Sequence, residues 1–340
     1  MRRFSIIGAG AWGTALALVV GRGGGEALIW AHEEDVAQSI NRGDGNPRFL
    51  PGIPLGPGIR ATTDLAGAAK ADALLLATPA QHLRQTLGRL APHLGTSRPL
   101  VLCAKGIEQG SGLLMTEVAE SVAPGHRLAV LSGPSFAAEV ALELPTAVTL
   151  ATTDPQLGSA LAEALASRRF RPYLSDDPVG AELGGAVKNV LAIAAGIVEG
   201  ARLGDNARAA LITRGLAEML RLGLAKGARS ETLAGLSGLG DLVLTCTGGQ
   251  SRNHGLGVAL GQGRSLADAL GSGPAVVEGV TSAAAVLRLA HSLGVDMPIA
   301  VAVDAVLTGA LGVAEAIAGL LERPLKREDE TGQFGSKLKS

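Results

Sequence analysis

Lys188 is the clearest candidate for proton chemistry in this chain, because it lies in a predicted helix that is mostly apolar. Its neighbours three and four positions away include Gly184, Gly185 and Ala192, which share its face of the helix. A face of small residues lets another backbone or a ligand approach closely. Burial there would lower the pKa of the lysine toward the range that suits proton transfer. The alternative is a lysine whose stem crosses the core and whose ammonium reaches water.

Two glycine-rich stretches further along carry polar groups that suit a reactive site. Asp241 follows the stretch 235–240 and stands among apolar residues, where a buried carboxylate needs partners. A simpler interpretation is that it caps a helix. Ser251, Arg252 and Asn253 follow Gly-Gly-Gln, and their hydroxyl, guanidinium and amide suit a phosphate-sized anion. Alone, such a tripeptide is more often an ordinary surface loop.

The N-terminus carries the pattern of a dinucleotide-binding loop. The apolar run Phe4 to Ile7 predicts a buried strand, and Gly8, Gly10 and Gly13 follow as G-x-G-x-x-G before a helical run. The first glycine permits the tight turn, the second lets the backbone approach a pyrophosphate, and the third lets the helix pack on the strand. The helix N-terminus offers free N–H groups to phosphates. The alternative, a structural glycine turn, does not require this strand–loop–helix context.

The elements that must position these groups form two kinds of segment. Up to about residue 178, short apolar runs alternate with helical stretches, which predicts a doubly wound, mostly parallel sheet of the Rossmann type. Beyond it, long helical patterns predict an all-α domain, opened by Asp177 as helix cap with Pro178 at the first helical position. Expected strands are 27–30, 72–77, 99–104, 128–132 and 147–152, and expected helices are 179–200, 206–226, 279–293 and 298–309. The expected domains are 1–178 and 179–325, with a polar C-terminal tail at 326–340.

Composition excludes several classes of function. The chain has 340 residues, a net charge of −1 and no basic block, which argues against nucleic acid as a partner. We expect no membrane span and no signal peptide, since no apolar run reaches spanning length and the first strand begins almost at once. The two cysteines, Cys103 and Cys246, fit a reducing cytoplasm, and no metal-ligand cluster is visible.

Taken in order, these motifs resemble the bacterial-type glycerol-3-phosphate dehydrogenases that use NAD or NADP, from about Phe4 to about Leu325. The resemblance implies reversible hydride transfer between NAD(P)H and dihydroxyacetone phosphate, giving sn-glycerol 3-phosphate. It further implies supply of glycerol 3-phosphate for phospholipid synthesis in the cytoplasm, and a homodimer is a further expectation. The motifs that carry it are Gly8 to Ala17, Lys105-Gly106, Gly133 to Ala137, Glu182 to Asn189, Gly235 to Thr245, Ser251-Arg252-Asn253 and Val276 to Gly279.

The resemblance also implies roles for particular residues. Lys188 would be the general acid and base, with Asp241 holding its ammonium. The implied cofactor contacts are Gly8, Gly10, Ala11, Trp12, Gly13, His32, Lys105, Ala137, Arg252, Val276 and Glu278. The implied substrate contacts are Lys105, Gly133, Ser135, Lys188, Asp241, Ser251, Arg252 and Asn253. The sequence departs from the usual family pattern at Ala11, where serine is common, and at Ala77-Thr78-Pro79-Ala80.

The choice between NAD and NADP stays open at this level. No carboxylate stands at Ala31 or His32, where one would hold a ribose 2′-OH and repel a 2′-phosphate, but Glu33 and Glu34 follow at once. His32 can donate to a 2′-phosphate or stack on adenine. We expect acceptance of both forms, with NADPH at least as good as NADH.

Two other functions compete with this interpretation. The β-hydroxyacid and ketopantoate reductase groups share the domain plan, but the β-hydroxyacid group pairs its lysine with an asparagine four residues later. Here Asn189 follows Lys188 directly and Ala192 occupies that position. A regulatory module that only senses a dinucleotide would not need Lys188, Asp241 and the 251–253 loop together.

Overall fold

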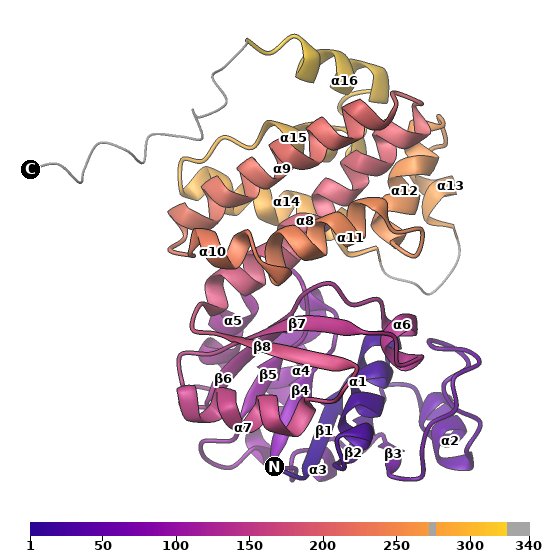
Figure 1. Ribbon diagram of the computed structural model, residues 1–340, viewed down its shortest axis with the longest axis vertical. Helices are drawn as coiled ribbons and strands as arrows, with labels where there is room; N and C mark the ends of the chain where they lie inside the picture. Colours follow the sequence, from indigo (N-terminus) through magenta and orange to yellow (C-terminus); the bar gives the residue numbers. More distant parts are fainter. Residues whose placement is uncertain (272–276, 325–340) are drawn as a thin grey trace, which may run out of the picture.

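The computed structural model describes residues 1–271 and 277–324. A sheet with its helices forms one half of the molecule and a bundle of helices forms the other (Figure 1). The long helix α8 (Pro178–Gly200) follows the last strand and enters the bundle. The polar tail expected at 326–340, and Val276, lie outside the described residues.

The N-terminal half is an eight-stranded sheet in the order β3-β2-β1-β4-β5-β6-β7-β8. All neighbouring strands run parallel except β6 and β7, which are antiparallel. The strands are β1 (Arg3–Ile7), β2 (Glu26–Trp30), β3 (Ile59–Thr62), β4 (Ala73–Leu76), β5 (Leu100–Leu102), β6 (Leu128–Ser132), β7 (Thr146–Ala151) and β8 (Phe170–Ser175). The helices of this half are α1 (Ala11–Arg22), α2 (Glu34–Arg42), α3 (Leu65–Ala68), α4 (Leu83–Leu90), α5 (Met115–Val122), α6 (Ala137–Ala141) and α7 (Pro155–Leu165).

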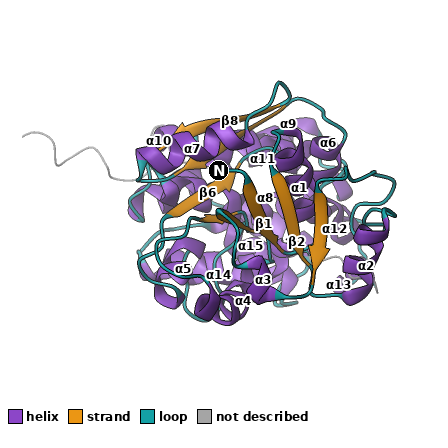
Figure 2. Ribbon diagram, turned by 90° about the horizontal axis from the view of Figure 1, so that it is seen from below, coloured by secondary structure: helices purple, strands orange, loops and turns teal. Residues whose placement is uncertain are grey.

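Alternation along the central strands divides the core into two layers. Phe4 and Ile6 of β1 pack with α1, α2, α6 and α7, whereas Ile7 packs on the other face with α3, α4 and α5. Figure 2 shows helices on both sides of the strands. Both faces of these strands are therefore buried, which explains why they appear as continuous apolar runs in the sequence.

The C-terminal half is built around α8, which contacts α9, α11, α12, α14 and α15. Its apolar residues form the centre of a separate core. The other elements here are α9 (Asp205–Ala225), α10 (Ser230–Leu233), the π-helical turn η3 (Leu236–Gly240), α11 (Asp241–Thr247), α12 (Arg252–Gly261), α13 (Leu266–Leu270), α14 (Glu278–Ser292), α15 (Pro298–Leu307) and α16 (Val313–Leu321). Asp177 caps α8, accepting a hydrogen bond of 2.9 Å from the backbone N–H of Gly180.

The predicted fold class is confirmed: a mostly parallel, doubly wound sheet precedes a helical half. Two strands, β3 and β8, were not predicted. Both are edge strands with exposed positions, and β8 contains Arg171 and Pro172. Edge strands are not buried on both faces, so they lack the apolar run that identifies a central strand. The division of domains at 178 and 179 stays a prediction.

One sequence expectation was wrong. Helix α8 is long and apolar enough to cross a membrane by length and composition, although we expected no such run. Every residue of its apolar window is buried inside the protein. Its apolar character is explained by its position at the centre of the helical core, where neighbouring helices and the ends of β6 and β7 cover it.

Candidate active site

The three glycines of the N-terminal loop have three different surroundings. Gly8 has φ +120°, and a Cβ there would lie 3.0 Å from the backbone of Ala77 and Thr78. A Cβ on Gly13 would overlap the carbonyl oxygen of Gly8, so only glycine lets α1 pack this close to β1. A Cβ on Gly10 would meet nothing within 4 Å. The open space lies at the position where a pyrophosphate would approach the backbone, and this arrangement fits a dinucleotide.

Further features at this loop fit a bound dinucleotide. Helix α1 has no side-chain cap at Gly10, so its first N–H groups are available to phosphate oxygens. Trp12 Nε1 and Thr78 Oγ1 are buried without a hydrogen-bond partner among the described residues. Ala11 lies beside Trp12 in the first turn of α1. Buried donors of this kind need a partner, and the polar groups of a cofactor would supply one.

The other implied cofactor residues surround the carboxyl ends of the strands. His32 follows β2, is exposed, and its ring centroid lies 6.2 Å from that of Trp30. Ala137 begins α6 after β6, and Glu278 begins α14. The structure brings neither His32 nor Ala137 into the hydrogen-bonded groups described next.

A carboxylate that binds two lysines is the centre of the candidate site. Lys188 Nζ donates to Asp241 Oδ1 at 2.6 Å and Lys105 Nζ donates to Asp241 Oδ2 at 2.8 Å. Lys188 also donates to Thr245 Oγ1 at 3.1 Å, and Lys105 to the carbonyl oxygen of Gly133 at 2.9 Å. We call Lys105, Lys188 and Asp241 the lysine–aspartate cluster.

Glycines of α8 explain how four distant segments meet at this cluster. A Cβ on Gly184 would overlap the backbone of η3 at Ser237, and one on Gly185 would lie 2.8 Å from Ser132 Oγ and 3.3 Å from Lys105 Cγ. The small-residue face thus lets η3 and the ends of β5 and β6 approach α8. Asp241 begins α11 directly after η3, but its side chain faces the lysines and does not cap the helix.

The electrostatics of the cluster favour a lysine that titrates near neutral pH. Burial lowers the pKa of Lys188 from 10.5 to about 8, with Asp241 opposing this effect and Lys105 adding to it. Asp241 is 1% exposed and Lys188 7% exposed. A lysine with this pKa can both donate and accept a proton under physiological conditions.

A chain of amides and a carboxylate joins α8, α12 and α14 beside the cluster. Asn253 Nδ2 donates to Asn189 Oδ1 at 2.9 Å, and Asn253 Oδ1 accepts from the Gly279 N–H at 2.9 Å. Asn189 Nδ2 lies 3.5 Å from both Glu278 Oε2 and the Lys105 carbonyl oxygen. Burial raises the pKa of Glu278. These contacts fix α12 and α14 relative to Lys188.

The remaining implied substrate residues differ in whether their side chains already form hydrogen bonds within the protein. Ser251 caps α12 by accepting from the His254 N–H, and Ser135 Oγ donates to the Gly133 carbonyl oxygen at 2.9 Å. Arg252 is exposed at the first position of α12 and forms no hydrogen bond or ion pair with any residue that the structure describes. Its guanidinium is therefore available to an anion.

Sequence reasoning assigned no role to Thr245 and none to Asn189. Thr245 donates to the Asp241 carbonyl oxygen at 2.6 Å while accepting from Lys188. The signal was present, because residues four apart on a helix share a face. Asn189 was considered only as the last residue of a family motif and as evidence against a rival family, although its amide connects three segments of the site.

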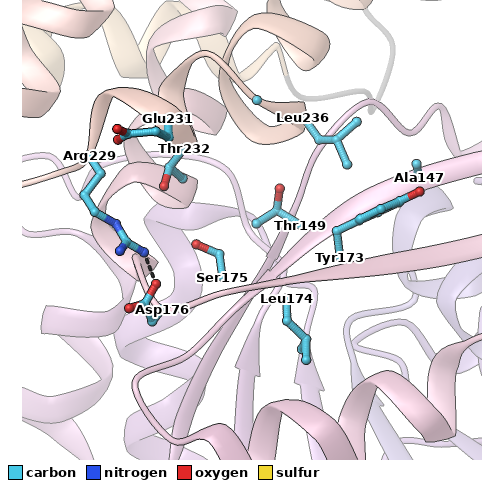
Figure 3. Close-up of a pocket in the computed structure, with 11 residues that line it drawn as sticks. Ala147, Thr149, Tyr173, Leu174, Ser175, Asp176, Arg229, Glu231, Thr232 and Leu236 are labelled. Carbon is cyan, nitrogen blue, oxygen red and sulfur yellow. Dashed lines mark hydrogen bonds and ion pairs between the residues drawn. The ribbon is translucent and has the colours of Figure 1, made fainter.

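A separate cavity lies between the β7–β8 edge of the sheet and the segment 229–236 (Figure 3). It has a volume of about 710 Å³. Thr149, Tyr173 and Ser175 form its floor, and Arg229 pairs with Asp176 at one end. None of the sequence-predicted site residues lines it. Within residues 1–271 and 277–324, no three His, Cys, Asp or Glu side chains come together to hold a metal.

Two family models together match most of the chain. The model described as NAD-dependent glycerol-3-phosphate dehydrogenase N-terminus matches residues 3–158, and the corresponding C-terminus model matches residues 177–318. Relatives called glycerol-3-phosphate dehydrogenase [NAD(P)+] are 58% identical in both Parvibaculum lavamentivorans and Caulobacter vibrioides. Each alignment covers 96% of this chain and 98% of the relative.

Solved structures also resemble this chain over most of its length. The glycerol-3-phosphate dehydrogenase of Coxiella burnetii matches with a TM-score of 0.91 and 41% identity, covering 95% of this chain and 99% of the other. A ketopantoate reductase from Ralstonia eutropha matches with a TM-score of 0.59 at 16% identity, over 93% of this chain and 99% of its own. The second likeness concerns the fold alone, and it explains why that group shares the domain plan.

Proposed function

Because the chain belongs to the NAD-dependent glycerol-3-phosphate dehydrogenase family, we propose that it catalyses the reversible reduction of dihydroxyacetone phosphate to sn-glycerol 3-phosphate with NADPH or NADH. The observation that carries this proposal is the lysine–aspartate cluster, in which Lys188 donates to Asp241 at 2.6 Å. A module that only senses a dinucleotide would not need these residues, so it is the weaker alternative.

The hydrogen-bond inventory of the two lysines supports their roles. An ammonium has three N–H donors. Lys188 uses one on Asp241 and one on Thr245, and Lys105 uses one on Asp241 and one on Gly133. One donor of each lysine has no partner among the described residues. Two free N–H donors, one on each lysine that Asp241 holds, suit a substrate with several oxygens.

Lys188 is the residue that we assign to proton transfer. As the carbonyl oxygen of the substrate gains negative charge, the free N–H of Lys188 stabilises it and then protonates it to give the alcohol. Asp241 holds the ammonium in place, and Thr245 accepts a second hydrogen bond from it, which fixes its orientation. In the oxidative direction the neutral amine removes the same proton. The glycine-rich loop would hold the pyrophosphate of the dinucleotide, and its nicotinamide would supply the hydride for reduction.

Arg252 is the residue that we assign to the substrate phosphate. It stands at the first position of α12, where free backbone N–H groups and the helix dipole also favour an anion. A guanidinium binds phosphate with two parallel hydrogen bonds. Ser251 and Asn253 flank it, and Asn253 is fixed through Asn189 to the helix of Lys188. The phosphate would thus be held by a part of the molecule that does not react.

Several further points belong to the same proposal. The enzyme works in the cytoplasm and supplies glycerol 3-phosphate for phospholipid synthesis, and residues 1–178 and 179–325 are its cofactor and catalytic domains. We also propose a homodimer, supported by large apolar side chains exposed near the C-terminal helices. These are Val301, Leu311 and Leu321. Light scattering at micromolar concentration tests the assembly, and a monomer mass would contradict it.

The test of the activity is oxidation of NADPH and of NADH, followed by absorbance, on addition of dihydroxyacetone phosphate. Lys188→Ala should abolish turnover, while Lys70→Ala, which removes an exposed lysine of the N-terminal half, should leave it unchanged. Glycerol 3-phosphate should be identified as the product. Absence of oxidation with both cofactors, in protein that binds them, would refute the proposed reaction.

A further inference from the structure

The loop between α2 and β3 is tied directly to the dinucleotide loop. Asn46 is 1% exposed, and its Nδ2 donates to the Ala9 carbonyl oxygen at 2.7 Å and to Thr14 Oγ1 at 2.8 Å. The Asn46 side chain and backbone also accept hydrogen bonds from the N–H groups of Phe49 and Leu50. Residues 46–50 are therefore held in a fixed position against the glycine-rich segment.

This anchor places Arg48 beside the carboxyl end of β2. Its guanidinium lies over the ring of Phe49, with 5.2 Å between the central carbon and the ring centroid. Its nitrogens lie 3.9 Å from Glu33 Oε1 and 3.7 Å from Asp35 Oδ2. Both distances exceed a good hydrogen bond, and Arg48 forms none with any residue that the structure describes. The fork of donors is oriented by Phe49 but remains available.

The carboxylates at this place are not equivalent. Glu34 accepts from Thr63 Oγ1 at 3.2 Å and from Gln38 Nε2 at 3.1 Å, so the residue after β3 and a residue of α2 hold it. Glu33 accepts no side-chain hydrogen bond among the described residues and is 30% exposed. It also stands about 20 residues after the last glycine of the loop, the spacing of the residue that binds the adenosine ribose in dinucleotide folds.

We propose that Arg48 and Glu33 form a cofactor-selection pair: Glu33 accepts the 2′-OH of NAD, and Arg48 leaves Glu33 to bind the 2′-phosphate of NADP. This inference rests on the proposed use of a nicotinamide dinucleotide. With NADP bound, the positive charge of Arg48 would lie beside the 2′-phosphate and offset its repulsion by Glu33, so one site accepts both forms. A guanidinium provides two parallel donors to a phosphate, and a loosely held ion pair is easily exchanged for it.

The test is equilibrium binding of two fragments, adenosine 2′,5′-bisphosphate and adenosine 5′-monophosphate, measured by calorimetry. They differ only in the 2′-phosphate and contain no nicotinamide. We expect Arg48→Gln to weaken the bisphosphate by about tenfold to a hundredfold, the range of a charged hydrogen bond, and to leave the monophosphate within about twofold. Glu33→Gln should strengthen the bisphosphate and weaken the monophosphate.

Two matched variants control for charge alone. Arg42→Gln removes an arginine from the other end of α2, where it pairs with Asp44, and Glu34→Gln removes the neighbouring carboxylate. Neither should change the ratio of the two affinities. Raising the ionic strength should weaken the bisphosphate in the wild type and much less in Arg48→Gln.

Two results would overturn the proposal. One is an unchanged affinity of Arg48→Gln for the bisphosphate, and the other is an equal loss for both fragments, which would make Arg48 a loop anchor only. The Arg48 side chain is 41% exposed, so its replacement leaves the core intact, and a melting curve verifies this. Fragment discrimination that depends on Arg48 in a protein without dihydroxyacetone phosphate reductase activity would refute the proposed reaction and leave this inference standing.

Discussion

Replacing Asp241 with asparagine tests the electrostatics of the site most directly. Asp241 is the carboxylate shared by Lys105 and Lys188, and it is 1% exposed. Asparagine keeps the size and one acceptor oxygen but removes the charge. The two ammonium groups then face each other without a counter-ion, so the pKa of Lys188 must fall further.

The size of the effect follows from the present pKa. Burial lowers the pKa of Lys188 to about 8 although Asp241 raises it. An adjacent opposite charge is worth about 1–3 pKa units, so loss of about two gives a pKa near about 6. At about pH 7.5 the protonated fraction then falls from about three quarters to about 3%. Reduction of dihydroxyacetone phosphate should therefore slow by about 25-fold at that pH and recover as the pH approaches about 5.5.

The assay is kcat/KM for dihydroxyacetone phosphate between pH 5 and 9, at one ionic strength and with saturating NADPH. In the wild type, reduction should decline as the pH rises through about 8 and oxidation of glycerol 3-phosphate should increase, because the two directions need opposite forms of Lys188. In Asp241→Asn the decline of reduction and the increase of oxidation should both occur at lower pH. Asp44→Asn, an exposed aspartate paired only with Arg42 among the described residues, should leave them in place.

Two outcomes would refute this reasoning. If reduction by the variant still declines near pH 8, Asp241 does not set the pKa of Lys188. A loss of equal size at every pH would assign Asp241 to positioning alone. Because an unpaired buried charge costs about 3–5 kcal/mol, circular dichroism at each pH must accompany the kinetics.

Four further predictions follow from the same geometry. Lys188→Ala should lower turnover by about 10²–10⁴-fold while fluorescence titration shows nearly unchanged NADPH binding; near-normal turnover would rule out its role. Gly10→Val should block cofactor binding without unfolding the helical half, since its side chain would occupy the pyrophosphate space; normal NADPH binding would make the loop structural only. The ratio of catalytic efficiencies should favour NADPH or be near one, and a preference for NADH of about a hundredfold, about 2.7 kcal/mol, would contradict it. Burial raises the pKa of Glu182 from 4.5 to about 7, so the folded state holds its proton more tightly and the free energy of unfolding falls as the pH rises across that window. In Glu182→Gln this fall, measured by urea denaturation, should be smaller by about 3 kcal/mol. An equal pH dependence of stability in both proteins would count against it.

The sequence by itself determined the fold class and most of the central elements. Strands such as β1 and β6 are covered on both faces, so their apolar runs identify them without further information. The glycine loop was recognisable because its three glycines lie within one strand–turn–helix unit, in which Gly13 lies in close contact with Gly8. Asp177 and Pro178 marked the start of α8 for an equally local reason, a cap and a fixed φ.

Only the tertiary structure decided which polar groups meet. Lys105 and Asp241 are 136 residues apart, and no periodicity relates them; the open face at Gly184 and Gly185 brings them to Lys188. The edge strand β8 was hidden for a similar reason, since its stability comes from pairing with β7 rather than from its own apolar pattern.

The surroundings of Arg48 could not be anticipated either. In the sequence it is one arginine in a loop rich in proline and glycine, and its position depends on Asn46 reaching the backbone of Ala9, 37 residues earlier. Hydrogen bonds between distant segments carry no local signature, whereas helix caps, tight turns and buried strands do. The chemistry of single residues was therefore accessible from the sequence, and the pairing of those residues into a site required the fold.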